Sequence, residues 1–230
     1  ESLTALVEQQ GDALAAIMLT PFHHPAFEDS ALPTPEFVTA VNQLTQQHGI
    51  LLIIDDVRCG FRLHPQGSHK LYGFEPDLIC FSKALGNGYP ISACVGRKAI
   101  KIAASKCFLT GSFWNAAVPM AAALKTIEIA KRDQIAIQLE RRGTQLVEGM
   151  LNLGLRYGLP LQASGPAAMP YVRVANDHSF RKQQALCAAA TQNGLYLHPH
   201  HNWFLCAAHT REVIDESLQR FEAALQGLEL

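Results

Sequence analysis

The chain has 230 residues, 48% of them hydrophobic, which is enough for a sizeable core and one to two domains. Its 19 basic and 20 acidic side chains are well mixed and give a net charge of -1, which excludes a basic stripe for nucleic acid and a polybasic membrane patch. The apolar runs reach only strand length, and the six cysteines show no Cys-x-x-Cys spacing. We therefore expect no membrane span, and reduced core thiols in a cytoplasmic protein.

Strands and helices alternate up to about residue 100. Thr34 and Pro35 are typical of a helix start, and Phe37, Val41 and Leu44 recur on one face of that helix before Gly49 ends it. The pattern predicts helices over residues 3–10 and 35–48, and strands over residues 15–20, 50–55, 78–81 and 91–95. This order predicts an α/β fold with a mostly parallel sheet.

The pattern changes in the second half of the chain. Long helices are predicted over residues 116–131 and 133–153, and Gly154 follows them. Beyond this point we expect strands over 170–174, 195–197 and 203–207, a helix over 180–193, and a last helix that Thr210 caps. The sequence thus predicts part of a large α/β domain over residues 1–153 and a small α+β C-terminal domain over 154–230.

Two polar residues end short apolar runs. Asp55 ends the run that begins at Ile50, and Lys83 comes directly after the run Leu78–Phe81 and Ser82. If both runs are buried parallel strands, both side chains lie at the edge where such sheets bind ligands. A lysine that forms a Schiff base and a carboxylate that keeps a pyridine nitrogen protonated are what pyridoxal 5'-phosphate (PLP) chemistry requires. A lone lysine at a strand end is ordinarily a solvated charge, so the prediction rests on the pair.

The runs around these residues carry a specific resemblance. Residues 53–62 (IIDDVRCGFR), 76–78 (PDL) and 82–90 (SKALGNGYP) are similar to class III aminotransferases of PLP fold type I. Residues 60–62 (GFR) and 204–210 (FLCAAHT) are most similar to the glutamate-1-semialdehyde aminomutase branch. Family subunits are nearly twice this length, so the chain resembles the C-terminal part of one. The upstream half would carry the phosphate-binding turn and the aromatic residue that stacks on the cofactor ring.

The resemblance implies the cofactor PLP and a set of residues that bind it. Asp55 would contact the pyridine nitrogen, Val57 would pack on the ring, and Lys83 would form the Schiff base. Ser112 falls at the family's Gly-Thr position, which implies that it binds the cofactor phosphate of the neighbouring subunit. Each active site would then need two chains, so the resemblance implies a homodimer with composite sites.

The resemblance further implies an aminotransferase that moves an amino group between an amine or amino-acid-like donor and a carbonyl acceptor, both small molecules, through a Lys83 aldimine. Two alternatives are a glutamate-1-semialdehyde-type 2,1-aminomutase and a dimeric scaffold that has lost catalysis. Retention of both Asp55 and Lys83 argues against the scaffold.

Three segments depart from the family pattern. Asp56 stands where the family usually has Glu, and residues 114–117 (WNAA) replace the usual Ser-Gly-Asn-Pro. Residues 20–25 (TPFHHP) replace a Glu-Pro motif with a downstream Asn that would contact the cofactor's phenolic oxygen. We expect His24 or Arg58 to take that role, because both side chains donate hydrogen bonds.

Two rival hypotheses concern other residues. Histidines 198, 200, 201 and 209 with Cys206 are ligand types that zinc accepts, but their spacing fits no standard finger, so we expect no metal site. Ser112 and Ser164 each adjoin a glycine but lack the Gly-x-Ser-x-Gly turn of serine hydrolases.

Overall fold

The computed structural model describes residues 2–228, and contacts divide the chain into two compact units. The first unit comprises residues up to Pro21 together with Pro33–Gln134. The second comprises Phe22–Leu32 and the residues from Ile135 onward. The division lies before the second long helix, whereas the domain boundary at residue 153 expected for the complete subunit stays a prediction.

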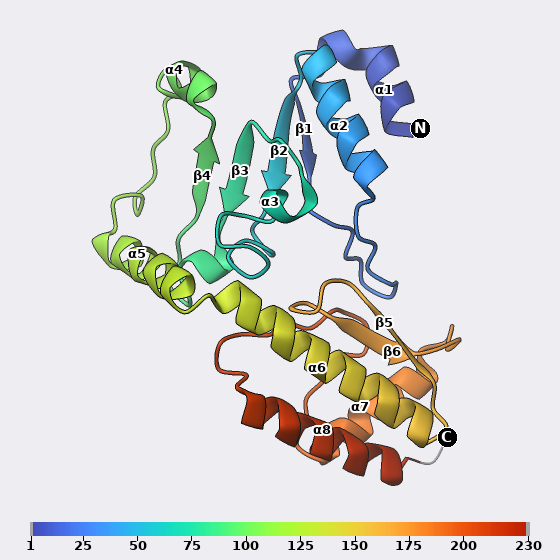
Figure 1. Ribbon diagram of the computed structural model, residues 1–230. Helices are drawn as coiled ribbons and strands as arrows, with labels where there is room; N and C mark the ends of the chain where they lie inside the picture. The colour runs from blue at the N-terminus through green and yellow to red at the C-terminus, as the bar shows by residue number, and fades with distance from the viewer. Residues whose placement is uncertain (1, 229–230) are drawn as a thin grey trace. The chain divides into compact units, whose positions relative to one another are not determined.

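The first unit is built on a four-stranded sheet in the order β1-β2-β3-β4 (Figure 1). Its strands are β1 (Ala16–Leu19), β2 (Leu51–Asp55), β3 (Leu78–Phe81) and β4 (Ala93–Gly96). The first three strands are parallel, which confirms the mostly parallel sheet, and β4 runs antiparallel to β3. The connection from β3 to β4 is too short for the helical crossover that a parallel neighbour requires.

The buried residue Asp77 fixes the pairing of β2 with β3 near the N-terminal ends of both strands. The Asp77 N–H donates to the Leu52 carbonyl, and its carboxylate accepts from the Leu52 N–H, both at 2.8 Å. The same carboxylate forms an ion pair with Arg97, which follows β4. Asp77 therefore joins β2, β3 and the end of β4 through one side chain.

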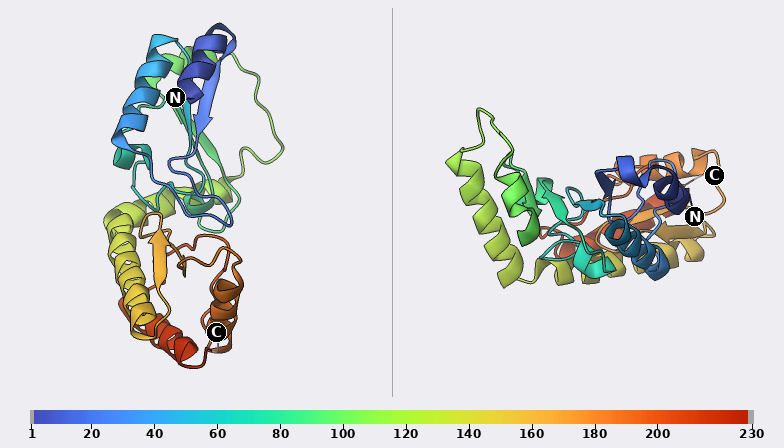
Figure 2. Two further views of the ribbon diagram at one scale, coloured as in Figure 1. Left: turned by 90° about the vertical axis from the view of Figure 1, so that its right-hand side faces the viewer. Right: turned by 90° about the horizontal axis from the view of Figure 1, so that it is seen from above.

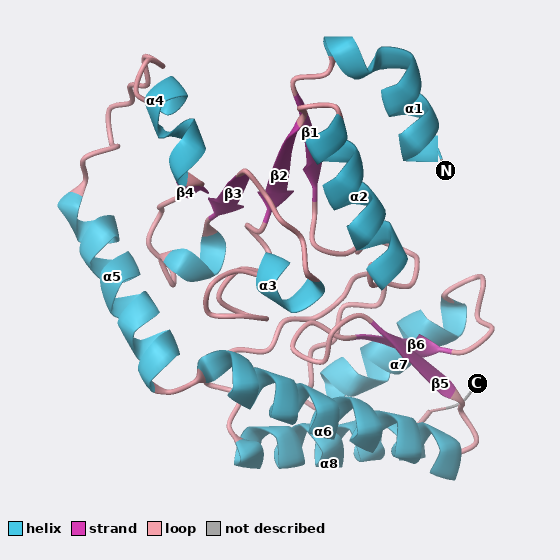
Figure 3. Ribbon diagram, turned by 45° about the horizontal axis from the view of Figure 1, so that its top comes forward, coloured by secondary structure: helices cyan, strands magenta, loops and turns pink. Residues whose placement is uncertain are grey.

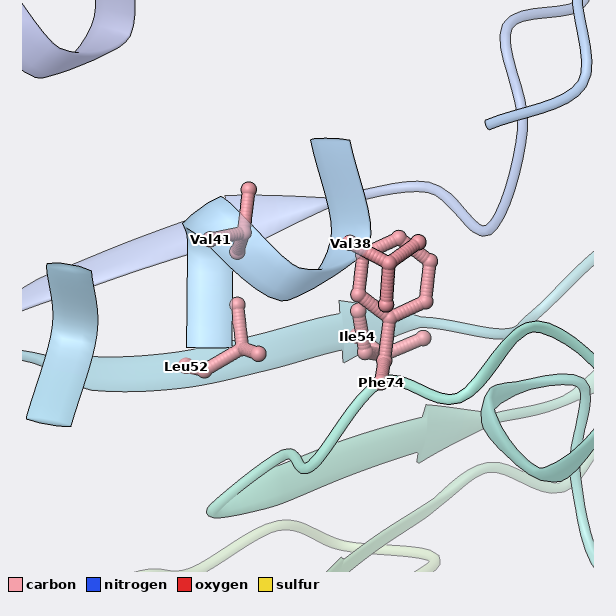
Figure 4. Close-up of a cluster of buried hydrophobic side chains, with 5 residues drawn as sticks. All are labelled: Val38, Val41, Leu52, Ile54 and Phe74. Carbon is pink, nitrogen blue, oxygen red and sulfur yellow. The ribbon is translucent and has the colours of Figure 1, made fainter. Parts of the chain in front are cut away.

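Helices α1 (Ser2–Gln10) and α2 (Pro35–Gln47) cover the sheet, and Thr34 caps α2 by accepting from the Phe37 N–H. Figure 4 shows the core beneath α2, where valines of the helix lie over side chains of β2 and a following loop residue: Val38, Val41, Leu52, Ile54 and Phe74. Phe37, expected on the buried face, is instead 43% exposed, because Val38, Val41 and Leu44 occupy that face.

The remaining helices of the first unit are short, except for α5. They are α3 (His69–Tyr72), α4 (Lys101–Ala104), α5 (Ala117–Arg132) and 3-10 turns at Gly11–Ala13, Lys83–Leu85 and Lys98–Ile100. Ala123 of α5 packs with Phe81 and Leu85, so this helix contacts the segment that follows β3.

The second unit packs helices around a two-stranded antiparallel sheet. It contains α6 (Ile135–Arg156), β5 (Leu161–Ser164), β6 (Tyr171–Val174), α7 (Arg181–Gln192) and α8 (Arg211–Gln226). Helix α8 contacts both α6 and α7, as Figures 2 and 3 show, while α6 also packs on β5. Both long helices expected around residue 133 are confirmed, and so is the helix that Thr210 caps.

The predicted strands over residues 195–197 and 203–207 are wrong, and β5 was missed. The Leu195 N–H bonds back to Ala190 and closes α7, so this residue is part of a helix end. The Trp203 N–H donates to the Pro170 carbonyl, and the Leu205 N–H donates to the Ala168 carbonyl. These two isolated bonds do not form the continuous ladder of a β-strand.

A salt bridge holds the segment Phe22–Leu32 to the small sheet. Arg173 of β6 donates two hydrogen bonds to the Asp29 carboxylate, at 2.9 and 2.8 Å, and Gln162 of β5 donates a third. These donors, Arg173 above all, lower the pKa of Asp29. The carboxylate is thus ionised at neutral pH and ties this segment to the second unit.

Gly60 allows the turn after β2 to approach β3 closely. A Cβ atom at this position would lie 2.6 Å from the Phe81 ring and 2.7 Å from the Asp56 carbonyl oxygen. We expect Gly60→Ala to lower the free energy of unfolding by about 1–3 kcal/mol, the usual cost of overpacking a core. Denaturant titration of the full-length subunit measures this. Gly227→Ala is the matched control, because its nearest atom would be 3.9 Å away; equal effects of the two changes would contradict the close approach.

Candidate active site

Asp55 is the last residue of β2, and its side chain is half-buried. The Val57 N–H donates to the Asp55 carboxylate at 3.1 Å, so the turn after the strand holds one oxygen of this group in place. In the parallel pair Asp55 lies opposite Cys80, and the Asp56 N–H donates to the Cys80 carbonyl. The pairing of the two strands therefore fixes the position of the Asp55 backbone, from which the carboxylate extends.

Lys83 follows β3 after a single intervening residue and begins a 3-10 turn. Its side chain is exposed, and its backbone is left-handed, with φ 46°. For a residue other than glycine this conformation costs about 1–3 kcal/mol, and such residues are enriched at functional sites. Six other non-glycine residues of the described chain also have a positive φ, so the position of Lys83 beside Asp55 is what makes this strain informative. Ser82 anchors the turn, because its hydroxyl donates to the Ile91 carbonyl at 2.9 Å. The fold thus holds Lys83 in a backbone conformation that lysine does not favour by itself.

Asp55 ends β2 and Lys83 follows β3, so both lie at the carboxyl ends of adjacent parallel strands, which the arrowheads mark in Figure 1. Ligands of such sheets bind beyond these ends. The structure therefore brings the two predicted residues to one edge of the first unit. An amine and a carboxylate at this edge suit a ligand that has both an electrophilic carbon and a basic ring nitrogen.

Asp56, the neighbour of Asp55, points into the protein and is fully buried. Ser68 donates two hydrogen bonds to its carboxylate, from the backbone N–H at 2.7 Å and from the hydroxyl at 2.6 Å. Burial raises the pKa of Asp56 from 3.8 to about 6, although the bonds from Ser68 act in the opposite direction. The two adjacent carboxylates thus have different environments, and Asp56 has a structural partner. No motif marked Ser68 in the sequence.

The other predicted residues lie in different parts of the molecule. Val57 and Arg58 are half-buried in the turn after β2, beside Asp55. Ser112 is exposed in the loop before α5 of the same unit. His24 belongs to the second unit, where its ring meets Phe22 edge to face at a centroid distance of 5.1 Å. The expected roles of Ser112, Arg58 and His24 toward a cofactor stay predictions.

The histidines of the second unit have local partners. The His209 ring accepts from the Cys206 N–H at 2.9 Å, and the His198 ring accepts from the His200 N–H at 3.1 Å. Phe27 stacks on the His200 ring. Within residues 2–228, no three His, Cys, Asp or Glu side chains are grouped so that they would hold a metal ion.

Residues 1–226 match the family model for class III aminotransferases. An aminopentol aminotransferase from Sphingopyxis macrogoltabida is 41% identical over 228 residues, which is 99% of this chain and 54% of that protein. A glutamate-1-semialdehyde 2,1-aminomutase from Chloroflexus aggregans is 31% identical over 97% of this chain and 55% of its own length. The chain therefore spans about half the length of the curated relatives it matches.

Solved structures agree with this relationship. The PLP internal aldimine form of the FumI protein from Sphingopyxis sp. MTA144 superposes with a TM-score of 0.94 at 41% identity, covering 99% of this chain and 57% of that one. An omega-transaminase from Sphaerobacter thermophilus has the same fold, with a TM-score of 0.84 at 21% identity over 97% of this chain and 54% of its own.

Fold and sequence define a fold type I transferase. The chain belongs to the class III aminotransferase family, so the expected family and the α/β fold are confirmed. The matched relatives include aminomutases as well as aminotransferases. The donor set of the site fits PLP: the half-buried Asp55 carboxylate suits its pyridine nitrogen, and the exposed primary amine of Lys83 suits its aldehyde.

The pKa of Asp56 predicts a pH-dependent stability. The folded-state pKa of about 6 lies above the ordinary value of 3.8, so the contribution of Asp56 is fully present below about pH 4 and is lost as the pH rises through 6. Between pH 4 and 7 we expect the wild-type protein to lose about 2 kcal/mol of unfolding free energy that Asp56→Asn does not lose. Denaturant titration of both full-length proteins across this range measures the difference.

Asp133→Asn is the control for this measurement, because Arg132 lowers the pKa of Asp133 and its contribution has the opposite sign. A difference between wild type and Asp56→Asn that stays constant with pH would contradict the buried, protonated carboxyl.

Proposed function

We propose that the complete protein is a PLP-dependent aminotransferase and that Lys83 and Asp55 are its principal cofactor-binding residues. The observation that supports this most is local. In a chain of the class III family, a lysine with a left-handed backbone and a half-buried aspartate lie at the carboxyl ends of adjacent parallel strands. The strained backbone at Lys83 is independent of the sequence resemblance.

The cofactor, when bound, withdraws electrons from the carbon that bears the amino group. Asp55 then holds the proton on the ring nitrogen, because a carboxylate stabilises a positive charge beside it. Lys83 would hold the aldehyde of the cofactor through its amine, and the same amine, when free, would move the proton of the amino-bearing carbon of the substrate. With the cofactor bound, Val57 would pack on the ring, and Arg58 or His24 would donate to the phenolic oxygen.

The substrates that we propose are a small-molecule amine or amino-acid donor and a carbonyl acceptor. This proposal draws on relatives named for aminopentol and for 3-aminobutyryl-CoA, at 41% and 32% identity. An aminomutase, which returns the amine to a neighbouring carbon of the same molecule, is the second candidate, since glutamate-1-semialdehyde 2,1-aminomutases are among the relatives. The higher identity to an aminotransferase favours release of a carbonyl product.

We propose a homodimer as the functional unit. Apolar side chains gather in the segment from α4 to α5, where Phe108 is 90% exposed and Phe113 is 85% exposed. Large apolar side chains that are exposed close together in sequence fit a surface that another subunit covers. Ser112 lies inside the same segment and would reach the cofactor phosphate of the partner. Trp114 is 54% exposed and folds over Gly111 of its own loop.

A cytoplasmic location is also proposed, because all six cysteines are free thiols. Among residues 2–228, no helix has the length and apolarity that a membrane crossing requires.

Lys83 provides the first test of the function. The full-length protein loaded with PLP should carry the cofactor covalently on the Lys83 peptide after borohydride reduction, because reduction makes the carbon-nitrogen bond permanent. Peptide mass spectrometry locates the label, and amine-dependent release of a carbonyl product measures transamination. Lys125→Ala is the control, since Lys125 pairs with Glu128 on the surface of α5. A Lys83→Ala protein that still transaminates would rule out the proposed role.

Composite sites are tested by mixing two inactive full-length variants, Lys83→Ala and Ser112→Trp. In a mixed dimer one site contains both defects and the other contains neither. Random exchange of subunits should therefore restore about a quarter of wild-type activity. Activity is followed as subunits re-associate after mild dissociation, with each variant alone as the control. No recovery at any mixing ratio would refute sites that are shared between subunits.

A further inference from the structure

Cys80 of β3 and Cys94 of β4 are directly opposite each other in the antiparallel pair. The Arg97 N–H donates to the Asp77 carbonyl at 3.1 Å, which marks a hydrogen-bonded position of this ladder. Hydrogen-bonded and non-hydrogen-bonded pairs alternate along such a ladder, so the two cysteines occupy a non-hydrogen-bonded pair. Cα atoms of these pairs are about 4.5 Å apart, inside the range of about 4.4–6.8 Å that disulfides span.

The two side chains also lie on the same side of the sheet. Opposite residues of a strand pair point to the same face, so the thiols of Cys80 and Cys94 are neighbours there. Both are free thiols; Cys94 is exposed and Cys80 is partly exposed. Burial and the neighbouring Cys94 raise the pKa of Cys80. Within the described residues, a more exposed thiol thus lies beside a less exposed one, which is the arrangement of an attacking and a resolving cysteine.

The other four cysteines differ. Cys59 and Cys187 are buried, and burial raises the pKa of each thiol to about 12. Cys107 is exposed, and its thiol interacts with the backbone carbonyl of Ala103. Cys206 is exposed in the second unit.

We propose that Cys80 and Cys94 are a redox modification site, at which a low-molecular-weight disulfide such as oxidised glutathione converts the two thiols into a reversible cross-strand disulfide. Cys94, after losing its proton to solvent, attacks one sulfur of glutathione disulfide; the sulfur-sulfur bond breaks and one glutathione leaves as thiolate. The thiolate of Cys80 then attacks the Cys94 sulfur and displaces the second glutathione. Two cysteine thiols are oxidised, and one glutathione disulfide is reduced to two glutathione molecules.

The position of this pair links it to the candidate active site. Cys80 lies opposite Asp55 in the parallel pair with β2, and β3 leads directly to Lys83. A bond between Cys80 and Cys94 would join the two strands on either side of the turn that carries Lys83. The inference itself rests on the register of β3 and β4 and does not require the proposed transamination.

The test uses the native full-length protein in glutathione buffers of increasing oxidised fraction, followed by acid quenching, alkylation and non-reducing peptide mass spectrometry. We expect a linked Cys80–Cys94 peptide that appears with the oxidised fraction and disappears on reduction with dithiothreitol. In Cys80→Ala the resolving thiol is absent, so Cys94 should instead carry a stable glutathione adduct.

Cys107→Ala is the matched control, because it removes an exposed thiol of the same unit and should leave the linked peptide unchanged. Cys94→Ala should abolish it. Separate alkylation of both thiols at every oxidised fraction would overturn the proposal. So would a linked peptide that appears only after denaturation, or a glutathione adduct on Cys94 that persists in the wild-type protein.

Discussion

The parallel register of β2 and β3 is the constraint on which the candidate site depends. It pairs Asp55 with Cys80, so the end of β2 lies beside the segment that leads to Lys83. Side chains alternate between the two faces of a strand, so a slip of one residue would move Asp55 to the face where Leu52 and Ile54 are buried. Asp77 opposes such a slip, because its hydrogen bonds to both backbone atoms of Leu52 exist in only one register.

Side-chain packing around the sheet stabilises the carboxyl ends of β2 and β3, where Asp55 and Lys83 lie. On one face, the valines of α2 bury Leu52 and Ile54 and hold β2 in place. At the end of β3, Phe81 packs against Leu85, in the turn that begins at Lys83, and against Ala123 of α5. These contacts support the strained turn. Burial of apolar side chains thus offsets the cost of the left-handed lysine. The site and the fold that maintains it are stabilised by the same contacts.

Much of this arrangement is predictable from the sequence, because the apolar runs around Ile54 and Ile79 are too short and too continuous for anything but buried strands. The cap at Thr34 and the spacing in α2 are equally local signals. Features that depend on the fold are not predictable in this way. The partner of Asp56 is Ser68, twelve residues away in a loop with no motif.

Tertiary context also decides the elements that were predicted wrongly. The residues around Trp203 have a strand-like composition, but they pair with the chain before β6 only through single hydrogen bonds. The antiparallel direction of β4 likewise depends on the fold, because the connection from β3 to β4 is too short for a parallel crossover. The strain at Lys83 has no signature in the sequence, because lysine rarely adopts a positive φ and its neighbours impose it.

The role of Asp55 is tested most directly by nitrogen-15 NMR of the full-length protein loaded with PLP labelled at the ring nitrogen. If the Asp55 carboxylate holds the proton there, the wild-type protein should show the chemical shift of a protonated pyridine nitrogen at neutral pH. Asp55→Asn should show the shift of the unprotonated ring, and Asp56→Asn should match the wild type. A protonated nitrogen in Asp55→Asn, or an unprotonated one in the wild type, would contradict the account.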